Sequence, residues 1–121
     1  MAVVLVVEDD FDSRLAIAYT LKDAGYEVVT ACDGVEALDA LYQYPKPDVI
    51  LLDLTMPDLD GWSFVKIKNG SQEIVDIPVI VLTAVPIHEA RSRGLEGTQL
   101  VIPKPFNVDD LLRAISVVTK K

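Results

Sequence analysis

Val3-Val-Leu-Val-Val7 begins the chain as an unbroken apolar run, the pattern of a strand buried on both faces. Further short apolar runs alternate with amphipathic segments, so the expected strands are 3–7, 27–31, 49–52, 79–82 and 100–102. The expected helices lie at about 11–24, from 34 to 42, at 62–68 and at 108–118. This alternation predicts an α/β fold with a doubly wound, five-stranded parallel sheet and helices on both faces.

The periodicity of the helices predicts which side chains face the sheet. The segment from Ile87 to Leu95 is weakly patterned, because Ala90 alone adds to its apolar spacing and Gly94 weakens it. Elsewhere the residues expected to face inward are Leu15, Ala18, Leu21, Val35, Leu38, Leu41, Tyr42, Val108, Leu111, Leu112, Ile115 and Val118. Four other residues receive structural interpretations: Cys32 as a small buried side chain, Trp62 in packing, and Lys120 and Lys121 at a helix C-terminus.

Length and charge exclude several classes of protein. The 121 residues fit one domain, and we expect residues 1–121 to form a single domain with no effector domain. A formal charge of −8 argues against direct nucleic-acid binding. No apolar stretch is long enough to span a membrane, and the single Cys32 excludes an internal disulfide. These features are typical of a cytoplasmic domain.

Polar side chains follow the expected strands at the points where the strands end. The first strand is followed by Glu8-Asp9-Asp10, the third by Asp53, the fourth by Thr83 and Ala84, and the fifth by Lys104. Because the carboxyl ends of parallel strands meet at one edge of the sheet, we expect these residues to lie together. Each has a structural explanation if taken singly; Asp10, for example, suits a helix N-cap.

Taken together, the residues indicate phosphoryl chemistry. Converging carboxylates repel one another unless a cation offsets them, and hard oxygen ligands suit Mg²⁺, with Mn²⁺ as a substitute. We expect Glu8 and Asp9 to hold the metal and Asp53 to act as a carboxylate nucleophile toward a phosphoryl donor. Lys104 would neutralise charge on the transferring oxygens, Thr83 would donate its hydroxyl, and the small Ala84 would keep the approach open.

Four motifs resemble the receiver domain of two-component response regulators, the chemotaxis-regulator-like family. They are Leu5-Val-Val-Glu-Asp-Asp10, Asp53-Leu-Thr-Met-Pro-Asp-Leu-Asp-Gly61, Val81-Leu-Thr-Ala84 and Lys104-Pro-Phe106, in the family's order and near its spacing. The resemblance covers essentially the whole chain. It implies a flavodoxin-like sheet ordered 2-1-3-4-5 and a signalling domain that is not a turnover enzyme.

The resemblance also assigns roles to individual residues. Asp53 takes the phosphoacceptor position and is a metal ligand with Glu8 and Asp9, while Thr55 offers the metal its backbone carbonyl. Thr83 and Lys104 take the switch and phosphate-pairing positions, and the Lys104–Pro105 bond is expected to be cis. The implied partners are a sensor histidine kinase or histidine phosphotransfer protein, which donates the phosphoryl group, and a downstream target protein.

The sequence departs from the family in two places. Val101 stands where an aromatic ring usually serves the readout, and the stretch from Thr83 to Lys104 is about one residue short. We therefore expect a non-standard readout, through the first helix and its loops or through ordering of the fourth-helix segment. Val85 has no polar group to orient water, which predicts slow loss of the phosphoryl group.

Other functions remain open at this point. The chain could be a receiver excised from a larger regulator or hybrid kinase. A flavodoxin-like cofactor carrier would share the topology, but Glu8-Asp9-Asp10 would repel its phosphate. An aspartyl-phosphate hydrolase would need an acid at the position of Thr55, and a degenerate receiver would not need all of the motif residues. His88 is expected to lie on the surface or at a helix cap rather than to bind a metal.

Overall fold

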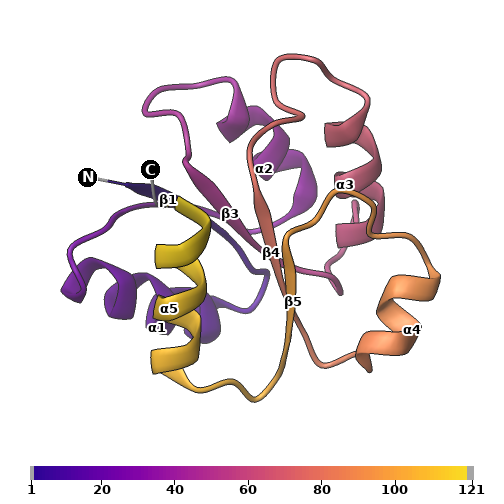
Figure 1. Cartoon of the computed structure of the whole chain (residues 1–121). Helices are drawn as coiled ribbons and strands as arrows, with labels where there is room; N and C mark the ends of the chain where they lie inside the picture. Colours follow the sequence, from indigo (N-terminus) through magenta and orange to yellow (C-terminus); the bar gives the residue numbers. More distant parts are fainter. Residues whose placement is uncertain (1, 120–121) are drawn as a thin grey trace.

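Within the described residues, 2–119, the computed structural model contains one sheet of five parallel strands in the order β2-β1-β3-β4-β5 (Figure 1). Lys120 and Lys121, and the expectation placed on them, lie outside this range. The elements alternate as β1 (Val3–Val7), α1 (Phe11–Asp23), β2 (Glu27–Ala31), α2 (Gly34–Leu41), β3 (Val49–Asp53), α3 (Gly61–Asn69), β4 (Val79–Thr83), α4 (Ile87–Ser92), β5 (Leu100–Pro103) and α5 (Val108–Thr119). The predicted flavodoxin-like, doubly wound fold and its strand order are confirmed.

The three central strands separate two apolar cores. β1, β3 and β4 are buried along their whole length, so alternate side chains of each strand point into opposite layers. Leu5 and Val7 belong to the core under α2, α3 and α4, whereas Val4 and Val6 belong to the core under α1 and α5. Figure 1 shows these two helical layers on either side of the sheet. The uninterrupted apolar run at residues 3–7 is thus explained by burial on both faces.

The residues that end β3, β4 and β5 belong to the strands themselves rather than to the loops that follow. β3, β4 and β5 each run one residue further than expected, so that Asp53 and Thr83 are the last strand residues. Asp53 is in register with Leu82, and Thr83 with Pro103. The backbone positions of both polar residues are therefore fixed by the ladder rather than by a loop.

Aspartates start three of the helices. The side chains of Asp10, Asp33 and Asp60 accept hydrogen bonds from backbone N–H groups three residues further on, at 2.8–2.9 Å. These bonds satisfy donors that have no partner inside a helix. The capping interpretation of Asp10 is confirmed, and part of the acidic composition is accounted for by helix starts.

The inward faces of α1 and α2 are confirmed only in part. Ala18 and Leu21 in α1 and Leu41 in α2 are buried as expected, together with Ile17, Gly34 and Ala37. Leu15, Val35 and Tyr42 are instead 41–54% exposed. In α2 the small residues Gly34 and Ala37 face the core, so the bulkier Val35 lies outside it. In α5, Leu111 and Ile115 are buried as expected, but Val108 at its first turn is exposed.

The weak fourth-helix segment forms only six residues of helix. α4 has no side-chain cap, and Ala90 is its buried residue. The preceding helix, α3, contains a fully buried lysine, Lys68, whose Nζ donates to the carbonyl of Val75 at 2.8 Å. Burial lowers the pKa of Lys68, and the charge of Asp76 partly opposes that effect. Among residues 2–119, no helix is both long and apolar enough to cross a membrane.

Gly61 packs its backbone against the residue that follows β3. A Cβ at this position would lie 2.7 Å from the Cα of Leu54 and 2.9 Å from the carbonyl oxygen of Asp53. Gly61→Ala is therefore expected to lower the free energy of unfolding by about 1–3 kcal/mol, measured by urea denaturation. Gly70→Ala is the control, since its nearest atoms lie at 3.6 Å and beyond. Equal losses in the two variants would contradict this account.

Candidate phosphoacceptor site

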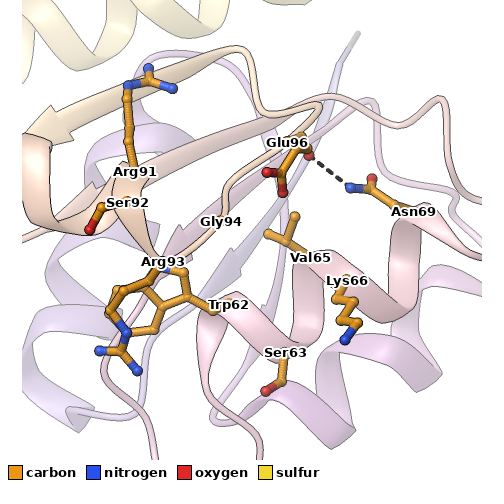
Figure 2. Close-up of a pocket in the computed structure, with 10 residues that line it drawn as sticks. All are labelled: Trp62, Ser63, Val65, Lys66, Asn69, Arg91, Ser92, Arg93, Gly94 and Glu96. Carbon is orange, nitrogen blue, oxygen red and sulfur yellow. Dashed lines mark hydrogen bonds between the residues drawn. The ribbon is translucent and has the colours of Figure 1, made fainter.

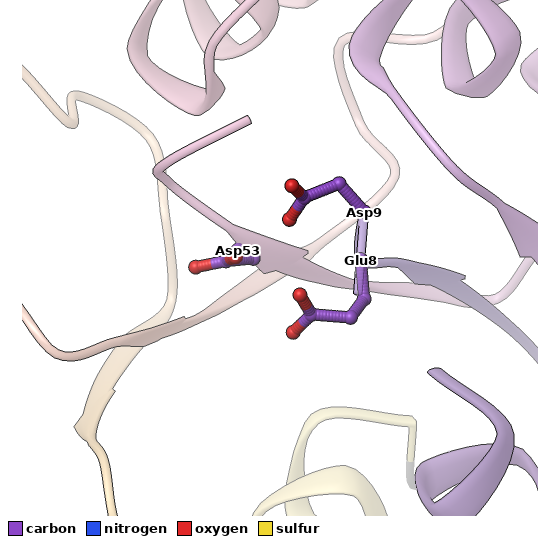
Figure 3. A group of neighbouring side chains, drawn as sticks. All are labelled: Glu8, Asp9 and Asp53. Atoms are coloured by element: carbon purple, nitrogen blue, oxygen red, sulfur yellow. The ribbon is translucent and has the colours of Figure 1, made fainter. Parts of the chain in front are cut away.

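Three carboxylates converge at the carboxyl edge of the sheet, as the strand ends predict. Glu8 and Asp9 follow β1, and Asp53 ends the neighbouring strand β3. Each offers one carboxylate oxygen, and these oxygens all lie within 4.8 Å of one another (Figure 3). Glu8 and Asp53 are only 4% and 6% exposed, while Asp9 lies at the open side. The arrangement is a partly buried acidic cluster that is open to solvent through Asp9.

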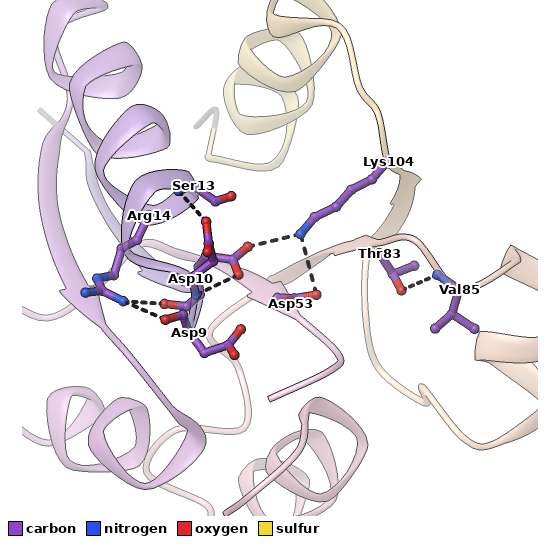
Figure 4. A network of polar contacts seen from close by, with 9 residues as sticks. Asp9, Asp10, Ser13, Arg14, Asp53, Thr83, Val85 and Lys104 are labelled. Atoms are coloured by element: carbon purple, nitrogen blue, oxygen red, sulfur yellow. Dashed lines mark hydrogen bonds and ion pairs between the residues drawn. The ribbon is translucent and has the colours of Figure 1, made fainter. Parts of the chain in front are cut away.

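Lys104 joins this cluster from the loop after β5. Its Nζ donates to Glu8 Oε1 at 3.0 Å and forms an ion pair with Asp53 Oδ1 at 3.7 Å (Figure 4). Burial alone would lower the pKa of Lys104, but the two carboxylates outweigh it and raise the pKa. Lys104 therefore stays charged and offsets one of the negative charges. Its bond to Pro105 is cis, as the family resemblance implied.

The single lysine leaves Asp53 under electrostatic strain. Burial, followed by the charge of Glu8, raises the pKa of Asp53 from its ordinary 3.8 to about 6, although Lys104 acts in the opposite direction. A carboxyl group of this kind favours either a proton or an additional cation. The site thus retains a demand for positive charge that the described side chains do not meet.

The donor set fits a hard divalent cation. Carboxylate oxygens with free access to water on one side are the ligands that Mg²⁺ prefers. Glu8, Asp9 and Asp53 form the group of possible metal ligands found among the described residues, and His88 is not part of it. His88 lies exposed on α4, which agrees with its surface interpretation.

Thr83 and Ala84 lie beside the acidic cluster, at the end of β4. Thr83 is buried, and its Oγ1 accepts a hydrogen bond from the backbone N–H of Val85 at 2.9 Å. Its hydroxyl proton is therefore available to another acceptor. Ala84 is exposed, and so is Thr55, which lies two residues after Asp53. The structure places the expected site residues at one edge of the sheet, with Thr83 on the far side of Asp53 from Asp9 (Figure 4).

Sequence reasoning missed Arg14, which braces the acidic loop. Its Nη1 donates to the backbone carbonyls of Glu8 at 2.8 Å and Asp9 at 3.4 Å (Figure 4). The backbone N–H of Asp10 in turn donates to Glu8 Oε2 at 3.2 Å. The sequence signal that could have identified Arg14 is a cationic residue near the start of a helix that directly follows an acidic run. These bonds fix the two acids relative to β1.

Cys32 does not behave as expected. It is half-buried rather than fully buried, and it lies in the turn directly after β2, where its backbone N–H donates to Glu36 Oε1 at 2.7 Å. Desolvation, followed by contact with Glu36, raises the pKa of its thiol. The raised pKa makes Cys32 a weak nucleophile.

Comparisons with known proteins agree with this geometry. A family model described as the response regulator receiver domain matches residues 4–116. Response regulator MprA of Mycobacterium tuberculosis is 37% identical over 119 residues, covering 98% of this chain and 50% of MprA. The solved structure of chemotaxis protein CheY4 of Vibrio cholerae has a TM-score of 0.88 and 37% identity, covering 98% of both chains. That of TrrA from Thermotoga maritima, in complex with Mg²⁺ and BeF, has a TM-score of 0.85 and 27% identity, covering 98% of this chain and 99% of TrrA.

The fold and the acidic edge together define a phosphoacceptor signalling domain of the two-component type. The chain belongs to the response regulator receiver domain family. It spans about half the length of the curated relative MprA. Membership of this family excludes the flavodoxin-like cofactor carrier, with which the domain shares only its sheet order.

The raised pKa of Asp53 predicts a pH-dependent stability. Since the pKa is about 6 in the folded protein and 3.8 in its ordinary range, ionising Asp53 destabilises the fold, and this cost grows between about pH 4 and pH 6. Asp53→Asn removes the charge and is expected to raise the free energy of unfolding by about 1–3 kcal/mol at pH 7.5 in EDTA, and by far less at pH 4. Urea denaturation at both pH values measures the difference.

Asp39→Asn is the matched control, because it removes an exposed carboxylate from α2 that does not belong to the cluster. A gain for Asp53→Asn that is the same at both pH values, or that Asp39→Asn shares, would show that the acidic cluster does not strain the fold.

Proposed function

We propose that Asp53 accepts a phosphoryl group from the phosphohistidine of a partner protein, with Mg²⁺ held by Glu8, Asp9, Asp53 and the backbone carbonyl of Thr55. The supporting observation is the buried carboxylate of Asp53, which lies between two further carboxylates and the ammonium of Lys104. The likeness to TrrA, which was solved with Mg²⁺ and BeF, supports the choice of metal. Mn²⁺ would serve as a substitute because it accepts the same oxygen ligands.

The transfer follows from the positions of the side chains. A carboxylate oxygen of Asp53 attacks phosphorus, a new O–P bond forms, and the N–P bond of the donor breaks with its electron pair returning to the imidazole ring. Bound Mg²⁺ would neutralise charge on the transferring oxygens. Lys104 Nζ, already 3.7 Å from Asp53 Oδ1, is close enough to pair with the phosphoryl group. Asp53 must be ionised to attack, and bound Mg²⁺ would favour its ionised form.

The readout passes through Thr83 in this proposal. Its hydroxyl would turn to donate to the new phosphoryl group, and the bond that Val85 N–H now makes to Thr83 Oγ1 would weaken. Val85 lies two residues before α4, and both Val85 and the half-buried Val101 pack against the core under that helix. Without a ring at residue 101, the change would reach the fourth-helix segment through the backbone. This is one of the two non-standard readouts expected from Val101; the other runs through α1 and its loops.

The phosphoryl donor in this proposal is a sensor histidine kinase or a histidine phosphotransfer protein, and the output is contact with a downstream target protein. The domain promotes its own phosphorylation and dephosphorylation and turns over no other substrate. Because the chain spans about half of MprA, a receiver taken from a larger regulator or hybrid kinase is the second candidate. The chemistry at Asp53 is the same in both cases.

Incubation with a small-molecule acyl phosphate and Mg²⁺ tests the central step. Intact-mass spectrometry is expected to show the addition of one phosphoryl group, which Asp53→Asn and EDTA each abolish. Asp10→Asn is the matched control, because Asn also caps helices and the side chain of Asp10 bonds Ser13 N–H rather than Lys104. Addition to Asp53→Asn, or none to the native protein, would overturn the proposal.

Val85 predicts a long-lived acyl phosphate. An apolar side chain cannot orient an attacking water, so we expect the phosphoryl group on Asp53 to be lost slowly. Val85→Asn would supply an amide for this purpose and is expected to shorten the lifetime about tenfold, whereas Val85→Ala leaves it nearly unchanged. The mass of the protein is followed over time after removal of the donor. Loss within seconds in the native protein would refute this expectation.

A further inference from the structure

A second concave site lies between α3 and α4, away from the acidic edge. Its volume is about 560 Å³ (Figure 2). One wall is the outer face of α3 from Trp62 to Asn69, and the other is the end of α4 with the loop from Arg93 to Glu96. Val65, between the two walls, is buried in the core under α3. We call this site the α3–α4 groove.

The α3–α4 groove gathers positive charge in an acidic protein. Lys66, Arg91 and Arg93 line it, although the chain has only eleven Lys and Arg residues and a formal charge of −8. Within residues 2–119 the ion pairs involve Lys104 and Arg113, so none of the three groove cations is paired with an acid. Glu96 is the one carboxylate in the lining. The groove thus attracts anions while most of the surface repels them.

Trp62 and Arg93 form a fixed platform at one end of the groove. The guanidinium carbon of Arg93 lies 3.8 Å from the centre of the Trp62 ring system, and Trp62 Nε1 donates to the carbonyl of Ala90 at 2.9 Å. Stacking uses the face of the guanidinium and leaves its edge N–H groups free (Figure 2). Those groups match the two oxygens of a carboxylate.

The length of the groove suits an extended peptide. Trp62 and Asn69 are seven residues apart on α3, which corresponds to about 10 Å along the helix axis and about three residues of extended chain. At the far end Asn69 Nδ2 donates to the carbonyl of Glu96 at 2.7 Å and joins the two walls. Acidic side chains of such a peptide could reach Arg93 and Lys66.

We propose that the α3–α4 groove binds an acidic, extended peptide segment of a partner protein. The interaction needs no phosphoryl group on Asp53 and no metal, so it goes beyond the function proposed above. Carboxylates of the segment pair with Arg93 and Lys66, and Trp62 lies directly beneath the bound chain.

The test uses a fluorescein-labelled peptide of sequence Glu-Glu-Leu-Glu-Glu at low salt. Fluorescence anisotropy measures its affinity, and an unlabelled copy is expected to change the emission of Trp62, the only tryptophan of the chain. Lys66→Gln combined with Arg93→Gln is expected to weaken binding at least about tenfold. Lys22→Gln combined with Arg113→Gln removes the same charge from α1 and α5, and is expected to change the affinity less than about twofold.

Two further variants sharpen the result. Glu96→Gln removes the carboxylate that repels the peptide and is expected to tighten binding, while its backbone bond to Asn69 remains. Asp53→Asn is expected to bind as the native protein does, so a failure of the phosphoryl chemistry leaves this test intact. No binding, equal weakening in both charge-matched double variants, or a change in Trp62 emission with inorganic phosphate but not with the peptide would each overturn the proposal.

Discussion

The mutual repulsion of Glu8 and Asp53 is the constraint on which the rest of the site depends. Both carboxylates are buried where neighbouring strands end, and Lys104 reaches them only because β5 completes the sheet beyond β4. The single ammonium of Lys104 does not neutralise the two buried carboxylates and the nearby Asp9. The negative charge that remains contributes to the raised pKa of Asp53. A divalent cation and a proton compete to neutralise this remaining negative charge. Metal binding and protonation are therefore linked, and acidification weakens the affinity for the metal.

This charge imbalance also explains why the fold around the site is so well secured. Arg14 fixes the backbone of Glu8 and Asp9 to α1, and the β ladder fixes Asp53 and Thr83. Repelling groups would otherwise move apart and lose the geometry that binds a cation. The stretch after Thr83 is held differently, by a short α4 without a side-chain cap. The site is thus rigidly supported at Glu8, Asp9 and Asp53, whereas the segment after Thr83 is held by few interactions. This combination suits a domain that responds to one added phosphoryl group.

Much of the fold and most of the site could be predicted from sequence because their signals are local. The apolar run of β1 requires burial on both faces, and parallel topology then brings Asp53 and Glu8 together without any knowledge of packing. The exposure of Leu15 and Val35 could not be predicted, since in α2 the small Ala37 rather than Val35 packs in the core. The role of Arg14 and the stacking of Arg93 on Trp62 depend on three-dimensional neighbours that no spacing encodes.

Lys68 has a mechanical consequence. Its ammonium is buried and held by the carbonyl of Val75, so moving residues 71–77 away from α3 would leave a charge without water or partner. The free-energy cost of separating them makes residues 71–77 and α3 move as one rigid unit. The wall of the α3–α4 groove that carries Trp62 is then the stationary one. Opening or narrowing of the groove would then require movement of α4 and of the loop after it, which the bonds from Trp62 Nε1 to Ala90 and from Asn69 Nδ2 to Glu96 hold against α3.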